Sequence, residues 1–106
     1  MKLAEERCEP CRVGTPALSH EQAVELLTQT PKWTLFSDRI EREFRFGDFR
    51  EAVSFVNKVA DAAEEHDHHP DILISYNKVK LEIRTHKIGG LSRNDFVLAA
   101  KIDRLA

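Results

Sequence analysis

The chain has 106 residues, of which 42% are hydrophobic and 32% charged, and its formal net charge is −2. This composition is typical of a soluble globular protein, and the length predicts one domain without room for a second core. The sequence has no basic stripe, no apolar stretch long enough to span a bilayer and no signal-peptide pattern. Direct nucleic-acid binding and membrane insertion are therefore not expected, and we expect a cytoplasmic protein.

Residues 1–18 are predicted to form an irregular lead-in, because they contain proline and glycine and show no hydrophobic periodicity. Cys8 and Cys11 form a Cys-x-x-Cys pair within this segment. A zinc ribbon needs a second such pair, and a thioredoxin-like motif should follow a strand and begin a helix. We favour a flexible or loosely docked segment, with a redox disulfide or a partial metal site as the alternatives.

A helix and two strands are predicted next. Ser19, with a glutamine three residues later, has the spacing of a capping box, and the helix that it begins ends before Pro31. The ranges 33–37 and 40–46 are predicted strands joined by a tight turn. Trp33 is interpreted as a core anchor, or alternatively as the wall of a pocket for a flat ligand.

The second half of the chain repeats this order and adds a final helix. Asp48 is the predicted cap of a long helix, which cannot continue through Pro70. The ranges 72–76 and 78–86 are predicted strands, and Ser92 caps the last helix.

The element order is therefore helix, strand, strand, helix, strand, strand, helix. It predicts a two-layer α+β domain over residues 19–106, in which three helices pack on one face of a four-stranded antiparallel sheet. The other face of the sheet is left uncovered, and a chain this short buries only a moderate share of its surface. Both features favour self-association or ligand binding.

Four of the five histidines lie between residues 64 and 95, and they are His66, His68, His69 and His86. Imidazole titrates near neutral pH, so such a cluster suits proton transfer or metal binding. Against a metal site, neighbours such as His68 and His69 point to opposite sides of an extended segment, and no His-x-x-x-His pair is present. A third interpretation is that these side chains only cap a helix and form hydrogen bonds.

Two carboxylates accompany the histidines. Glu64 lies one helical turn before His68, so it could orient an imidazole or bind an amidine-like pair of N–H groups, or it could simply be solvated. Asp95 lies three residues after Ser92, and this spacing by itself favours a carboxylate that caps the first turn of a helix.

The combined spacing resembles that of the pterin-4a-carbinolamine dehydratases, also called 4a-hydroxytetrahydrobiopterin dehydratases. The residues that carry it are Glu64, His68-His69-Pro70, Tyr76, His86 and Asp95, supported by Trp33, Phe46-Gly47-Asp48-Phe49, Asp67, Asn77-Lys78-Val79, Thr85 and Gly90-Leu91-Ser92. The resemblance covers about residues 18–103, and the lead-in with its two cysteines looks like that of bacterial members.

The resemblance implies the same α+β fold and a homodimer or homotetramer. It implies a hydro-lyase that removes water from a 4a-hydroxytetrahydropterin to give a quinonoid dihydropterin, without a metal or another cofactor. A pterin-dependent hydroxylase would be the metabolic partner. The alternatives are a protein-binding role as a dimerisation partner, or accessory work in another pterin pathway.

The resemblance also implies a division of roles. His68 would be the base near N5 of the pterin and His86 the acid at the 4a-hydroxyl, or these two roles could be exchanged. His69 could share a role, and Asp95 would orient an imidazole. The pyrimidine edge of the pterin would bind backbone near Asp67 and Thr85. The predicted substrate-binding residues are Glu64, Asp67, Thr85 and Trp33.

Overall fold

The computed structural model of the chain describes residues 2–8 and 16–106. Its helices and strands follow the predicted order, so the predicted α+β fold is confirmed. The elements are η1 (Leu3–Glu5), α1 (His20–Leu27), β1 (Thr34–Leu35), β2 (Ile40–Arg45), α2 (Phe49–His66), β3 (Asp71–Ser75), β4 (Lys78–Ile83), η2 (His86–Ile88) and α3 (Arg93–Asp103), where η marks a 3-10 helix.

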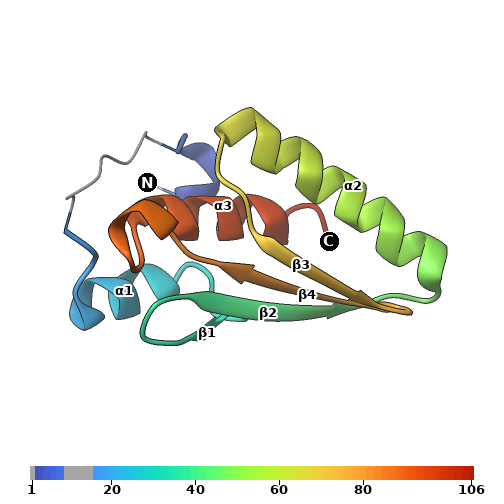
Figure 1. The fold of residues 1–106 in the computed structure, drawn as a ribbon, viewed down its shortest axis with the longest axis horizontal. Coiled ribbons are helices and arrows are strands. Elements are labelled where there is room, and N and C mark those ends of the chain that lie inside the picture. Colours follow the sequence, from blue (N-terminus) through green and yellow to red (C-terminus); the bar gives the residue numbers. More distant parts are fainter. Residues whose placement is uncertain (1, 9–15) are drawn as a thin grey trace.

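The four strands form one antiparallel sheet in the order β1-β2-β4-β3. Each hairpin supplies one inner strand, and β2 and β4 pair in register, with Phe44 opposite Val79. Figure 1 shows α2 and α3 next to each other over one face of this sheet, while α1 lies near the end of the sheet against α3 and β1. No helix among the described residues is long and apolar enough to cross a membrane.

Helix α2 forms for reasons that are visible in its sequence. Asp48 caps it, because its carboxylate accepts a hydrogen bond of 2.8 Å from the backbone N–H of Glu51. The helix buries a stripe of residues spaced three or four apart, which faces the sheet: Ala52, Phe55, Val59 and Ala63. It ends at Asp67, whose left-handed backbone (φ 49°) turns the chain toward β3.

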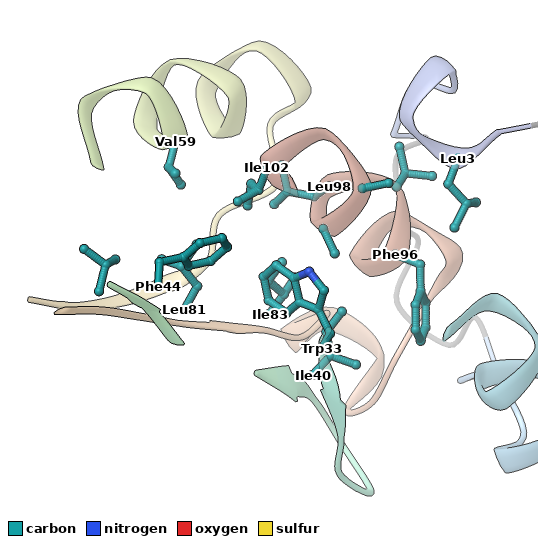
Figure 2. Close-up of a cluster of buried hydrophobic side chains, with 14 of the residues drawn as sticks. Leu3, Trp33, Ile40, Phe44, Val59, Leu81, Ile83, Phe96, Leu98 and Ile102 are labelled. Carbon is teal, nitrogen blue, oxygen red and sulfur yellow. The ribbon is translucent and has the colours of Figure 1, made fainter. Parts of the chain in front are cut away.

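The core lies between the sheet and the two covering helices. In Figure 2, Phe44, Leu81 and Ile83 from the strands face Val59 of α2 and Ile102 of α3. The burial of these apolar side chains supplies most of the stability of a small domain, because it removes apolar surface from water.

Trp33 belongs to this core and is 2% exposed. Its ring packs edge-on against Phe44, and its indole N–H donates to Asp103 Oδ1 at 2.8 Å. The same oxygen accepts a hydrogen bond from Arg42, whose guanidinium lies 4.1 Å above the Phe44 ring. This position matches the interpretation of Trp33 as a core anchor.

Strand β4 is shorter than the range 78–86 expected from its alternation. It ends at Ile83, because β2 begins opposite Ile83 and β3 begins opposite Glu82. Beyond that point neither neighbouring strand offers a backbone to pair with. Thr85 instead forms an isolated bridge with Gly90, and the chain between them makes the short helix η2.

Residues 2–8 are packed against the domain, so the expectation of a loosely docked lead-in does not hold for them. Leu3 is 1% exposed and lies in the core beside α3. Glu6 accepts two hydrogen bonds from Arg93, at 2.8 and 2.6 Å, and Lys101 donates to the carbonyl oxygen of Ala4. A single buried leucine gives no periodic pattern, which is why the sequence did not predict this contact. Residues 9–15, including Cys11, lie outside the described residues.

Candidate active site

The end of α2 presents two consecutive histidines. Asp67 adopts the left-handed conformation and donates its backbone N–H back to the last turn of the helix, and the N–H of His68 donates to the carbonyl oxygen of Ala63 at 3.1 Å. The chain therefore leaves the helix through a fixed turn. His68 and His69 follow this turn in a short segment before β3.

His68 contacts a buried carboxylate. Its Nε2 lies 2.5 Å from Oδ1 of Asp95, and the two side chains are 12% and 0% exposed. Asp95 lies in the first turn of α3, so the pair connects the end of one helix with the start of another. The carboxylate thus contacts an imidazole, and it also caps the helix, as the Ser92 spacing indicated.

Two further groups hold the Asp95 carboxylate. The backbone N–H of Ser92 donates to Oδ2 at 2.8 Å, and the hydroxyl of Thr85 lies 3.0 Å from each carboxylate oxygen. The Thr85 hydroxyl also lies 2.7 Å from that of Ser92. A buried carboxylate must be compensated by donors, and here a backbone amide, a hydroxyl and an imidazole supply them.

His69 has a different partner. Its Nε2 lies 2.7 Å from Oε2 of Glu64, and both side chains are exposed. The imidazole that Glu64 contacts is thus that of His69, and not that of His68 one helical turn away. The two neighbouring histidines contact different carboxylates, in line with the alternation of side chains along an extended segment.

His86 follows Thr85 directly and begins η2. Its imidazole is exposed, and no hydrogen bond or ion pair within residues 2–8 and 16–106 engages it. The Thr85 hydroxyl and the His68 ring bind the same carboxylate, so Asp95 ties the segment carrying His86 to the end of α2. An exposed imidazole beside this anchored segment is available to a ligand.

The other predicted site residues lie in different environments. Asp67 is exposed at the turn after α2, whereas Trp33 is enclosed in the core. Thr85 is 4% exposed, and its backbone N–H donates to the carbonyl oxygen of Gly90 at 3.0 Å. Its hydroxyl and its N–H are therefore both used within the protein.

The sequence indicates Ser92 as a helix cap, and the resemblance includes it in the Gly90-Leu91-Ser92 segment without a role of its own. The contact of the Ser92 hydroxyl with that of Thr85 joins the segment after β4 to the start of α3 and could not be inferred from local spacing, although the Ser-x-x-Asp pattern was a visible signal. His66 lies apart from these pairs and is half-buried, and burial, aided by the positive charge of Lys101, lowers its pKa. Within the part of the chain that the structure describes, no group of three or more His, Cys, Asp or Glu side chains could hold a metal ion.

Comparison with known proteins identifies the family. Residues 16–105 match the family model described as pterin 4 alpha carbinolamine dehydratase. The chain belongs to the pterin-4a-carbinolamine dehydratase family. This membership confirms the resemblance stated from the residue spacing and places the chain among hydro-lyases.

Individual relatives of the dehydratase family agree along nearly the whole chain. A protein of Halorhodospira halophila named "Putative pterin-4-alpha-carbinolamine dehydratase" is 48% identical, covering 99% of this chain and 98% of its own. The crystal structure of a transcriptional coactivator/pterin dehydratase from Brucella melitensis superposes with a TM-score of 0.81 at 32% identity, covering 85% of this chain and 98% of that one. Both proteins come from bacteria, in agreement with the resemblance of residues 1–18 to the lead-in of bacterial members.

A more distant structure shares the fold alone. It is a pterin dehydratase-like protein identified as a RuBisCO assembly factor in the alpha-carboxysome, with a TM-score of 0.59 and 21% identity over 70% of this chain and 86% of that one. The dehydratase fold therefore also occurs in a protein with an assembly role.

Proposed function

We propose that this protein dehydrates a 4a-hydroxytetrahydropterin to the quinonoid dihydropterin by general acid and base catalysis. The observation that carries the proposal is the His68–Asp95 pair: a buried carboxylate holds one imidazole at the end of α2, close in the hydrogen-bond network to the segment that presents His86. Family membership supports the reaction type.

The reaction needs two proton movements. The bond between C4a and the hydroxyl oxygen breaks, and the hydroxyl leaves as water once it has been protonated. The proton on N5 departs, and its bonding electrons form the new double bond between N5 and C4a. An acid and a base on the protein accomplish both steps, and a positioned proton transfer contributes about 10²- to 10⁴-fold in rate.

His68 is the proposed base at N5, because Asp95 engages its Nε2, and its Nδ1 has no hydrogen-bond partner among residues 2–8 and 16–106. His86 is the proposed acid at the hydroxyl, because its imidazole is exposed and directly follows the anchored Thr85. His69 has the exposed Glu64 as its partner and could share either role. After one turnover the proton taken from N5 returns to the acid through solvent, so the protein is regenerated.

The pterin ring has amino and ring N–H donors on its pyrimidine edge, and backbone carbonyl oxygens match them. Asp67 and Thr85, which flank the histidines, are the proposed backbone contacts. The N–H groups of both residues are used internally, so carbonyl oxygens would make these contacts. The carbonyl oxygen of Thr85 already accepts from the N–H of Ile88 at 3.2 Å and would use its second lone pair. A hydroxylase that releases the 4a-hydroxypterin would supply the substrate.

A direct assay tests the proposal. The purified protein is mixed with chemically generated 4a-carbinolamine in the presence of EDTA, and the formation of quinonoid dihydropterin is followed by absorbance. We expect a rate well above the spontaneous dehydration. Activity that is lost on metal stripping and restored by zinc would show a metal centre instead, and no acceleration at all would contradict the proposed reaction.

A further inference from the structure

The Thr85 hydroxyl is enclosed at the centre of the network around Asp95. It contacts both carboxylate oxygens at 3.0 Å and the Ser92 hydroxyl at 2.7 Å. With 4% of the residue exposed and its N–H bonded to Gly90, Thr85 presents neither donor to a ligand. Its side chain therefore serves the protein and not the substrate.

The donors in this network can be assigned from their chemistry. An ionised carboxylate only accepts hydrogen bonds, so Thr85, which has a single hydroxyl hydrogen, donates it to Asp95. The Ser92 hydroxyl, 2.7 Å away, must then donate to the Thr85 oxygen. On the other side of the carboxylate, Nε2 of His68 must carry a hydrogen in order to donate to Oδ1.

We propose that Thr85 is a positioning residue: its hydroxyl, oriented by Ser92, fixes the Asp95 carboxylate and so selects the Nε2–H tautomer of His68. The neutral imidazole then has its lone pair on Nδ1, and Nδ1 is the atom that accepts the proton from the substrate. The part of this inference that concerns catalysis rests on the proposed function, whereas the assignment of the tautomer does not.

Three variants separate a positioning role from a merely structural one. Thr85→Val removes the hydroxyl and keeps the shape, and Thr85→Ser keeps the hydroxyl. The matched control is Thr30→Val, because Thr30 is fully buried and its hydroxyl has no hydrogen-bond partner among the described residues. Ser92→Ala is the second test, since it removes only the donor that orients the Thr85 hydroxyl.

The first measurement is steady-state kinetics of carbinolamine dehydration. We expect Thr85→Val to lower kcat at least ~10-fold with KM within about 2-fold, because a donor to a charged group is lost while no substrate contact changes. Thr85→Ser should stay within about 3-fold of the wild type, and Thr30→Val should match it. Ser92→Ala should also lower kcat, by a smaller factor than Thr85→Val does. A rise in KM alone in Thr85→Val would instead mean that the Thr85 hydroxyl binds the substrate, and it would overturn the proposal, as would an unchanged kcat in this variant.

The second measurement is NMR of the protein with isotope-labelled histidine, which distinguishes the two imidazole tautomers. We expect His68 to show the Nε2–H tautomer in the wild type, Thr85→Ser and Thr30→Val, and a mixture of tautomers in Thr85→Val. Nδ1–H in the wild type would overturn the proposal. If the wild type lacks dehydratase activity while the tautomer follows this pattern, the proposed function fails and the positioning role stands. If Thr85→Val does not fold, the His68 tautomer and the kcat of Ser92→Ala test the positioning role instead. A wild-type tautomer and a wild-type kcat in Ser92→Ala would then overturn it.

Discussion

His68 and Asp95 are 27 residues apart in the chain, yet Nε2 of one lies 2.5 Å from Oδ1 of the other. The pair connects the segment after α2 to the first turn of α3. Since Asp95 is fully buried and also caps α3, the position of the His68 ring depends on the packing of both helices against the sheet.

The Asp95→Asn variant should be nearly inactive. An amide side chain can donate to the imidazole as well as accept from it, so it no longer enforces one tautomer of His68. We expect the dehydration rate to fall at least ~100-fold. The control is Asp103→Asn, the same change on the same helix, whose carboxylate contacts Trp33 and Arg42 and no histidine. Equal losses of activity in the two variants would remove Asp95 from the mechanism.

Replacement of the exposed histidine tests the proposed acid. His86→Ala should lower the catalysed rate at least ~100-fold, as expected for loss of a general acid. Because His86 is exposed, the free energy of unfolding should change little. The matched control is His20→Ala, which removes the one histidine outside the cluster, an exposed residue of α1. His86→Ala with the rate of the wild type would exclude it as the acid.

The N-terminal segment should contribute to stability. Leu3→Ala leaves a cavity beside α3 at a position that is 1% exposed, and such changes lower the free energy of unfolding by roughly 2–5 kcal/mol. Denaturant titration measures the difference, with exposed Val24→Ala as the control. Equal midpoints for wild type and Leu3→Ala would mean that residues 2–8 are detached in solution.

Stability should fall with decreasing pH because of His66. Burial lowers the pKa of this imidazole from its ordinary value of 6.5, with Lys101 acting in the same direction. Below 6.5 the unfolded chain takes up a proton that the folded chain binds less readily, so protonation favours unfolding. The loss of stability begins as the pH falls below 6.5, the pKa of the imidazole in the unfolded chain. It is complete once the pH has fallen below the lower pKa of the imidazole in the folded chain.

His66→Gln should therefore be less sensitive to acid than the wild type. Urea titrations at several pH values give the comparison, and titrations at about pH 8, where the wild-type imidazole is neutral in both states, supply the reference for packing effects. If the difference in unfolding free energy between variant and wild type is the same at every pH, His66 is not the cause.

Self-association is expected from the edge of the sheet. Among the described residues, strand β3 pairs with another strand on one edge only. Ile72 and Leu73 of this strand and Tyr76 just after it are exposed, Leu73 to 60%. An apolar edge strand is a natural pairing surface for a second chain. Sedimentation velocity at micromolar concentration should show a dimer or a larger assembly, and Leu73→Lys should shift it toward smaller species. A monomeric wild type would contradict this expectation.

Part of the candidate site was predictable because it depends on local signals. The two histidines at the end of α2 follow from Pro70, which no helix can continue through, and from the cap at Asp48, which sets where the helix begins. The contact of Asp95 with His68 was implied by the family resemblance and not by local spacing, because the spacing from Ser92 explains a helix cap equally well whether or not an imidazole is near.

The sequence by itself determined the element order and the caps at Ser19 and Asp48, since these depend on neighbouring residues and on periodicities of two and 3.6. Only the tertiary structure decided which carboxylates His68 and His69 contact, where β4 ends and how Leu3 is buried. These outcomes depend on the crossing of helices over the sheet and on strand register. Both are set by contacts between residues far apart in the chain, which no local pattern records.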